Sequence, residues 1–243
     1  MKGNSILMSW LGGILFLGGV LTGLVLSASA TWGPVEANLY TSLTADSRFT
    51  VKCPLLISPK ESAVVRAKIN NFTNEVVMPV VFAEISQANG PRRLNQTVTL
   101  APKESTTLEW KVNASDLVFD RLILVNILQA RYRDNPSFLG SCGIMLFSLF
   151  GLGGTLTFSL LAFLSLAGMV SGGTLWWRAR QPRDAFATAL ARINSFLMGI
   201  TILALVSAFM RAWGFTLFFD ALTLLVMGII FTDFVLSGRH RST

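Results

Sequence analysis

The stretch ILMSWLGGILFLGGVLTGLVLSAS, residues 6–29, holds no charged residue and is the first of four long apolar runs in this chain of 243 residues. The other runs are residues 143–177, 193–210 and 215–236. A helix rises about 1.5 Å per residue and the hydrocarbon core of a bilayer is about 30 Å thick, so about 20 apolar residues cross it. The runs therefore predict a membrane α-helical bundle of four transmembrane helices, with the lipid bilayer as its main partner.

A polar insert, residues 31–141, separates the first run from the other three. It carries 12 of the 20 Lys/Arg and 10 of the 13 Asp/Glu residues, so the net charge of +7 comes mainly from the membrane flanks. No basic stripe with interleaved aromatic residues occurs, and we expect no nucleic-acid partner.

Basic residues flank the runs in a pattern that predicts orientation, because short loops rich in Lys and Arg stay in the cytoplasm. These residues are Lys2, Arg178, Arg180, Arg183, Arg192, Arg239 and Arg241. We therefore expect a multi-pass protein of the plasma membrane with both termini in the cytoplasm and residues 31–141 outside.

The first run admits two interpretations. Ala28-Ser29-Ala30 is typical of a signal-peptide cleavage site, but the apolar stretch is longer than the usual signal core of about 7–15 residues. Residues 1–30 form either a retained signal-anchor helix, which we favour, or a cleavable signal.

The insert has a β pattern. Apolar and polar residues alternate over Ala63–Ile69 and Thr107–Val112, which predicts strands with one buried face and places Trp110 in the core. Val76–Ile85 and Leu122–Leu128 are further strand-like runs. Short strands separated by turn residues indicate a sandwich.

Two similar turns precede two of these strands, at Ser58-Pro59-Lys60-Glu61-Ser62 and Ala101-Pro102-Lys103-Glu104-Ser105. On these turns and strands, residues 49–132 resemble bacterial and archaeal immunoglobulin-like modules. The resemblance implies an all-β immunoglobulin-like sandwich, inserted into the helical bundle, with no catalytic residues of its own and variable binding partners.

The second run is too long for one span of ordinary tilt. Gly151, Gly153 and Gly154 indicate a break, so residues 142–243 are predicted to cross the membrane at about 155–177, 193–210 and 215–237. Residues 138–150 are then expected to be an apolar segment at the outer interface, or a first helical turn.

Small residues recur at helical spacing in two spans, as Gly19 and Gly23 in the first and Gly168 and Gly172 in the second. Glycine lets helix backbones approach closely where lipid gives no hydrophobic drive. We expect these glycines to pack helices within the chain, with packing against another subunit as the alternative.

Cys53 and Cys142 are the only cysteines, and both are predicted outside, where thiols tend to oxidise. They form either a disulfide between the sandwich and the head of the second span, or two small buried apolar side chains.

Ionisable residues inside spans are costly and often functional. Asp220 is predicted near the outer end of the fourth span, within reach of Arg211, and Asp233 near the inner end. We expect a structural ion pair between Arg211 and Asp220. A relay in a transporter or channel, using Arg211, Asp220 and Asp233, is the rival interpretation.

No catalytic or cofactor-binding set is evident. The only histidine, His240, lies three residues from the end of the sequence, and no phosphate-binding glycine motif occurs. We therefore expect no enzymatic activity, cofactor or metal. The leading hypothesis is an accessory or scaffold subunit bound to other membrane protein subunits, and the alternatives are a transporter component and a surface receptor or adhesin. Asn71, Asn95 and Asn113 match the N-glycosylation pattern.

Overall fold

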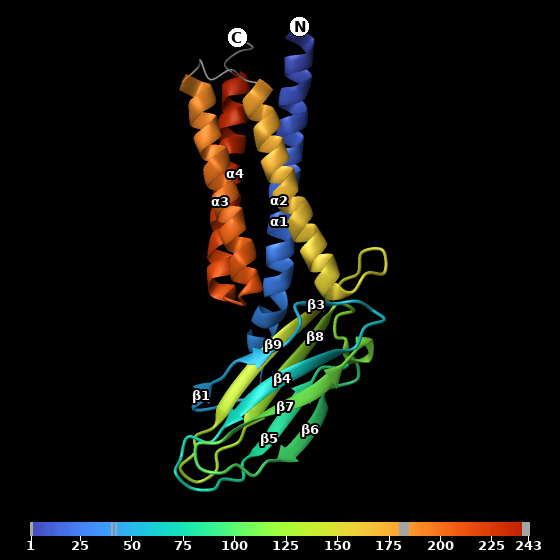
Figure 1. Cartoon of the computed structure of the whole chain (residues 1–243), viewed down its shortest axis with the longest axis vertical. Coiled ribbons are helices and arrows are strands. Elements are labelled where there is room, and N and C mark those ends of the chain that lie inside the picture. The colour runs from blue at the N-terminus through green and yellow to red at the C-terminus, as the bar shows by residue number, and fades with distance from the viewer. Residues whose placement is uncertain (1, 40, 42, 180–184, 240–243) are drawn as a thin grey trace. The chain divides into compact units, whose positions relative to one another are not determined.

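The computed structural model of the chain describes residues 2–39, 41, 43–179 and 185–239 (Figure 1). Two compact units divide the chain, and we describe each by itself: residues 1–31 with 159–243 form the helical unit, and residues 32–158 form the sandwich unit. The elements, in chain order, are α1 (Lys2–Leu39), β1 (Ser47–Arg48), β2 (Val51–Lys52), β3 (Leu56–Ile57), β4 (Ala63–Asn70), β5 (Val80–Ile85), β6 (Arg92–Thr97), β7 (Ser105–Val112), η1 (Ala114–Asp116), β8 (Leu122–Gln129), β9 (Phe138–Leu146), α2 (Gly154–Ala179), α3 (Ala185–Phe209) and α4 (Trp213–Arg239).

Four helices among the described residues are long and apolar enough to cross a membrane. Their bounds extend the predicted spans at most ends. The helix α3 begins at Ala185, eight residues before the start of the predicted span at residue 193. The helix α4 begins at Trp213 instead of Phe215, which places Asp220 deeper along the helix than the sequence suggested.

The sandwich unit contains two sheets, whose strands face each other in Figure 1. One sheet has the order β1-β9-β8-β5-β6, with β3 also paired to β9, and the other has the order β2-β4-β7. The short strands β1 and β3 run parallel to β9, and the remaining pairs are antiparallel.

The core between the sheets follows the alternation that the sequence predicted. In β4, Val65, Ala67 and Ile69 are fully buried, and the intervening Arg66 and Lys68 are exposed. Trp110 in β7 lies opposite Val65 and is 4% exposed, as expected for a core residue. Burial of such side chains is the main stabilising term for a small sandwich.

The expectation for residues 138–150 was wrong. Phe138–Leu146 is the strand β9, which pairs with β8 along its whole length. The sequence misled because both faces of this strand are covered. Cys142 and Ile144 point into the core, while on the other face a Cβ added to Gly143 would collide with the backbone of Gly33 in α1. A strand that is buried on both faces reads as a continuous apolar run.

The first helix, expected over residues 1–30, extends further along the chain. The helix α1 continues through Gly33 and Pro34 to Leu39, and its last residues belong to the sandwich unit, with Ala37 fully buried. Proline within a helix removes one backbone hydrogen bond. This part of the helix packs closely on β9, because the contact between Gly33 and Gly143 leaves no room for a side chain on either residue.

Candidate functional site

Close backbone contact joins α1 to α2 at the predicted glycines. A Cβ added to Gly19 would lie 2.7 Å from the backbone nitrogen of Met169, and one added to Gly172 would lie 2.6 Å from the carbonyl oxygen of Gly12. Gly168 faces the same region of α1, where its added Cβ would lie 3.2 Å from the Cα of Gly19. Within the chain, α1 therefore occupies these faces of α2.

Gly23 lies one turn further along α1 and faces two helices. A Cβ there would lie 2.7 Å from Cγ2 of Thr201 on α3 and 2.8 Å from Oγ of Ser165 on α2. The Ser165 hydroxyl donates a hydrogen bond of 2.7 Å to the carbonyl oxygen of Gly19. Small and hydroxyl side chains thus join the helices, as expected where lipid provides no hydrophobic drive.

Asp220 is the one carboxylate within the described side chains of the helical unit and is only 6% exposed. The Ser27 hydroxyl of α1, fully buried, lies 2.7 Å from its Oδ1 atom in a hydrogen bond. The other carboxylate oxygen, Oδ2, is buried and has no hydrogen-bond partner among the described residues. A buried polar atom without a partner costs free energy and is a reason to expect an unseen ligand, ion or water.

The ion pair expected between Arg211 and Asp220 is not among the contacts that Asp220 makes in the described part of the chain. Because α4 begins at Trp213, Asp220 lies two turns into the helix, about 10 Å along its axis. At that depth the carboxylate accepts a hydrogen bond from the Ser27 hydroxyl. The side chain of Asp233, the third residue of the predicted relay, lies outside the described residues.

Three buried polar residues share one face of α4, namely Thr216, Asp220 and Thr223. Their spacing of four and three residues is the helical period, so this face could have been recognised in the sequence. The Thr216 hydroxyl donates to the carbonyl oxygen of Ala212, just before α4, and the Thr223 hydroxyl donates to that of Phe219 within α4. These bonds satisfy the threonine donors and leave Oδ2 of Asp220 as the side-chain oxygen of these three residues that has no partner among the described residues.

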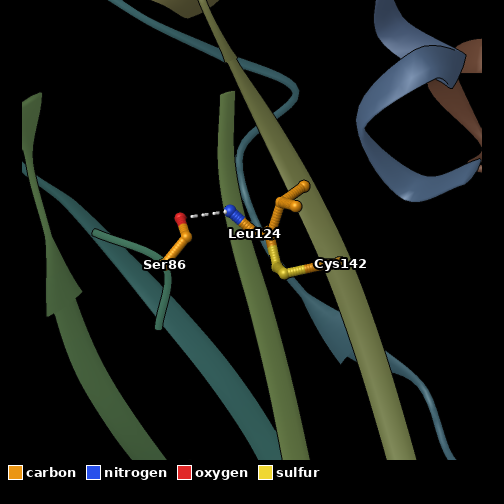
Figure 2. Close-up of a disulfide and its surroundings, with 4 residues drawn as sticks. Ser86, Leu124 and Cys142 are labelled. Atoms are coloured by element: carbon orange, nitrogen blue, oxygen red, sulfur yellow. Dashed lines mark hydrogen bonds between the residues drawn. A yellow bond between two sulfur atoms is a disulfide. The ribbon is translucent and has the colours of Figure 1, made fainter. Parts of the chain in front are cut away.

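Cys53 and Cys142 form a disulfide inside the sandwich unit, with their Cα atoms 6.5 Å apart. Cys53 follows β2. Cys142 was expected at the head of the second span but lies in β9. In Figure 2 the bond lies beside β8, where the Ser86 hydroxyl accepts a hydrogen bond of 2.9 Å from the Leu124 amide. The disulfide therefore links the two sheets of one domain, because β2 belongs to one and β9 to the other.

The two repeated turns have the same hydrogen bonds, but one has an additional role. The carboxylate of Glu61 accepts from the Ser58 amide at 3.1 Å, and that of Glu104 accepts from the Ala101 amide at 2.6 Å. Glu61 also accepts a bond of 2.9 Å from the amide of Gly154, the first residue of α2. A carboxylate at this position stabilises the helix start, because the first amides of a helix have no partner within it.

The outer faces of the two sheets differ in chemistry. On the three-stranded sheet, the outward residues include the charged Arg66, Lys68, Glu109 and Lys111, and Arg66 and Glu109 form an ion pair of 2.6 Å. On the six-stranded sheet, the outward side of β5 and the segment before it is apolar. We call this set the β5 stripe; its members are Val76, Met78, Val80 and Phe82, of which Val76, Met78 and Phe82 are 50%, 46% and 40% exposed.

The β5 stripe is polar at the end that follows Phe82. On the same face, Glu84 follows Phe82 and pairs with Arg93 of β6 at 3.0 Å. Phe82 itself lies between Asn95 of β6 and Leu128 of β8 in the sheet register. A stripe of large exposed apolar side chains is typical of a protein contact surface.

The three glycosylation patterns differ in accessibility. The Asn71 side chain is 2% exposed and its amide donates to the carbonyl oxygens of Glu75 and Ala101, at 2.7 and 2.8 Å. Asn113 accepts from the Ser115 amide at the start of η1. Asn95 is exposed on β6 and is free of such a structural role among the described contacts.

No family model and no curated protein matches the chain. Solved structures that are similar to it include the CARDB domain of a Pyrococcus furiosus protein in complex with di-metal ions, at 14% identity and a TM-score of 0.31, covering 44% of this chain and 95% of that one. Another is a β-glucuronidase from Bacteroides uniformis, at 14% identity and a TM-score of 0.30, covering 40% of this chain and 12% of that one. A third is a β-glucosidase from Listeria innocua, at 13% identity and a TM-score of 0.28, covering 40% and 16%. These matches are partial, and the description of the sandwich rests on its own strand order.

Proposed function

We propose that the chain is a non-enzymatic integral membrane protein that acts as an accessory subunit of a larger membrane assembly. In this proposal the four helices span the plasma membrane, both termini lie in the cytoplasm, and an immunoglobulin-like sandwich on the outer side contacts a partner protein through the β5 stripe. The observation that carries the proposal is the difference between the two outer faces of the sandwich, one charged and one apolar.

The apolar face supports a protein partner because large exposed side chains are the usual anchors of protein interfaces. Aromatic residues and Met are enriched there, and truncation of a buried anchor costs about 2 kcal/mol or more. Phe82 and Met78 provide one of each type. The disulfide between Cys53 and Cys142 supports an oxidising compartment for this domain.

Purification of the full chain in a mild detergent tests the contact. We expect stoichiometric co-purifying subunits with the wild type, and their loss when Met78 and Phe82 are both changed to Ser. Lys68→Ser, on the charged outer face of β4, is the matched control and should retain them. Retention of every subunit by the Met78/Phe82 variant would remove the β5 stripe from the proposal, and a monomer that binds a soluble ligand would favour the receptor hypothesis.

Orientation is tested independently by cysteine labelling in intact cells. The native cysteines are joined in a disulfide, so an introduced thiol gives the signal. We expect Lys103→Cys to react with an impermeant reagent from outside, and Arg183→Cys to react only after permeabilisation. Reaction of Arg183→Cys in intact cells would reject the orientation.

A transporter component is the second candidate, and the free Oδ2 atom of buried Asp220 favours it. Intramembrane carboxylates often bind a transported proton or cation. In reconstituted vesicles this candidate predicts a proton or cation flux that Asp220→Asn abolishes and Phe218→Leu, an exposed position on the same helix, leaves unchanged. If intact vesicles that contain the protein show no such flux, the result favours the accessory role over the transporter role.

A further inference from the structure

The helical unit contains a cavity of about 720 Å³ near the basic ends of α2 and α3, lined by residues of α1, α2 and α3. We call it the inner cavity. Its volume lies within the range of about 300–1,000 Å³ that is usual for sites holding small organic ligands. None of the residues discussed above as candidate functional groups lines it, so the proposed contact surface and Asp220 do not account for it.

The lining of the inner cavity is divided by chemistry. Phe16, Met169 and Met198 provide apolar walls, and Phe16 and Met169 belong to the buried core of the bundle. Arg178 and Arg192, one from α2 and one from α3, provide two positive charges. An occupant that satisfies both parts must be amphiphilic, with an apolar chain and a negatively charged head.

The two guanidinium groups strengthen the case for an anionic head. Among the described residues, neither Arg178 nor Arg192 forms an ion pair, although five other arginines do. Arginine presents several donors in a planar fork that suits the oxygens of a phosphate. The exposed Trp177 lies next to Arg178, and tryptophan with arginine at a helix end is typical of the lipid headgroup region.

We propose that the inner cavity binds an anionic phospholipid, with its phosphate at Arg178 and Arg192 and an acyl chain along Phe16, Met169 and Met198. The proposal rests on the membrane-spanning arrangement proposed above. A bilayer supplies such a ligand directly, and basic pockets between helices on the cytoplasmic side of a membrane are known to hold anionic headgroups.

Native mass spectrometry of the delipidated full chain, titrated with phosphatidylglycerol or phosphatidylcholine, tests the charge requirement. We expect phosphatidylglycerol to bind more tightly. Each of Arg178→Gln and Arg192→Gln should weaken it by about fivefold, and the double change by about thirtyfold, since one basic residue near an anionic lipid contributes about a factor of five. Arg211→Gln, which removes a charge that does not line the inner cavity, should leave binding unchanged.

Filling the cavity without changing its charge tests the location. Gly173 lines the inner cavity, and a Cβ added there would meet only Phe16, at 3.9 Å, so Gly173→Leu should fit and exclude the lipid chain. Ser195→Leu fills the cavity from α3 and serves if the first variant fails to fold. Gly199→Leu is the control and should retain the lipid, because Gly199 also lies on α3 and a Cβ added there would meet nothing within 4 Å.

Three outcomes overturn the proposal. The first is equal binding of the two lipids, and the second is an equal loss with Arg211→Gln and Arg178→Gln, which would indicate a general charge effect. The third is binding of inorganic phosphate that competes with the lipid and depends on the same arginines, which would assign the site to a free anion. Because cysteine labelling reports orientation separately, failure of lipid binding is distinguishable from failure of the proposed membrane arrangement.

Discussion

The sandwich and the helical bundle distribute their side chains in opposite ways. In the sandwich, large apolar residues such as Ile69, Ile85 and Ile127 are fully buried. In the bundle, large apolar residues such as Phe163 and Leu225 are 66% and 58% exposed, while hydroxyl and glycine residues lie inside. The exposed apolar side chains of the bundle are what the proposed membrane location requires, and the buried ones of the sandwich are typical of a domain in water.

This difference changes what holds each unit together. Water drives burial of apolar area in the sandwich, at about 25 cal/mol per Å². Lipid tails are as apolar as the side chains, so a bundle gains little from burial and depends on close backbone packing and interhelical hydrogen bonds. The Gly19–Met169 approach and the Ser165–Gly19 hydrogen bond are examples of both.

The largest expected effect concerns tryptophan in the two solvents. Trp110→Ala should lower the stability of the sandwich by about 3–5 kcal/mol, because it opens a cavity in a packed core. Trp10→Ala, at a helical position that is 67% exposed, should change stability by about 0.5 kcal/mol or less. Hydrogen exchange of full-length protein in detergent measures the sandwich, and thermal loss of helicity measures the bundle. Similar effects of the two changes would contradict the comparison.

The second prediction concerns two adjacent glycines in α1. Gly19→Leu should separate α1 from α2 and destabilise the bundle by about 1–3 kcal/mol, because its side chain meets the backbone of α2. Gly18→Leu has no neighbour within 4 Å and should be neutral or slightly stabilising. Unfolding of the helices in increasing sodium dodecyl sulfate measures both. If the two variants unfold alike, close packing at Gly19 does not stabilise the bundle.

Much of the fold could be predicted from local patterns. Strand alternation over Ala63–Ile69 and the length of the apolar runs depend on neighbouring residues alone, so the sequence predicts β4 and the four helices. The strand β9 escaped prediction because α1 covers its second face, which is a tertiary contact. Alternation disappears when both faces are buried.

The candidate site in the bundle was partly predictable. Asp220 is evident as a lone carboxylate in an apolar run, but its partner, Ser27, is 193 residues away in the sequence. Pairing them requires the rotation of α1 against α4, and helices that are apolar on all sides give little indication of which face turns inward. Arg211 was the nearer choice in sequence, whereas the described hydrogen bond of Asp220 comes from Ser27.

The third prediction concerns this hydrogen bond between α1 and α4. Ser27→Ala and Asp220→Ala should each destabilise the bundle, and the double change should be less than additive by about 0.6 kcal/mol, the average for interhelical hydrogen bonds in membranes. Asp220→Asn should cost less than Asp220→Ala, because an amide can keep the contact with Ser27. Arg211→Gln combined with Asp220→Ala should be additive. Strong coupling between Arg211 and Asp220 in the same unfolding assay would instead support an ion pair between them.

The smallest expected effect concerns a surface cluster of the sandwich and its dependence on pH. The Arg131 guanidinium, 2.8 Å from Asp46, and then the hydroxyl and amide of Ser137 hold the pKa of the Asp46 carboxyl well below its usual value. A lowered folded pKa adds stability above the unfolded pKa of about 3.9, and this is lost as pH falls further towards the folded value.

Asp46→Asn should therefore lower the Tm of the sandwich at pH 7 only slightly, by about 2 °C or less, because the group is exposed and solvent screens the pair. Below about pH 4 the difference between wild type and variant should shrink, since the carboxylate of the unfolded wild type begins to take up its proton while the folded one, with its lowered pKa, stays ionised. The helical unit is the internal control, because Asp46 belongs to the sandwich and its change should not alter the detergent-induced unfolding of the helices. A difference in Tm that stays constant from pH 7 to pH 3 would show that the charge of Asp46 is not what stabilises this corner, and that its hydrogen bonds to Ser137 survive in the amide.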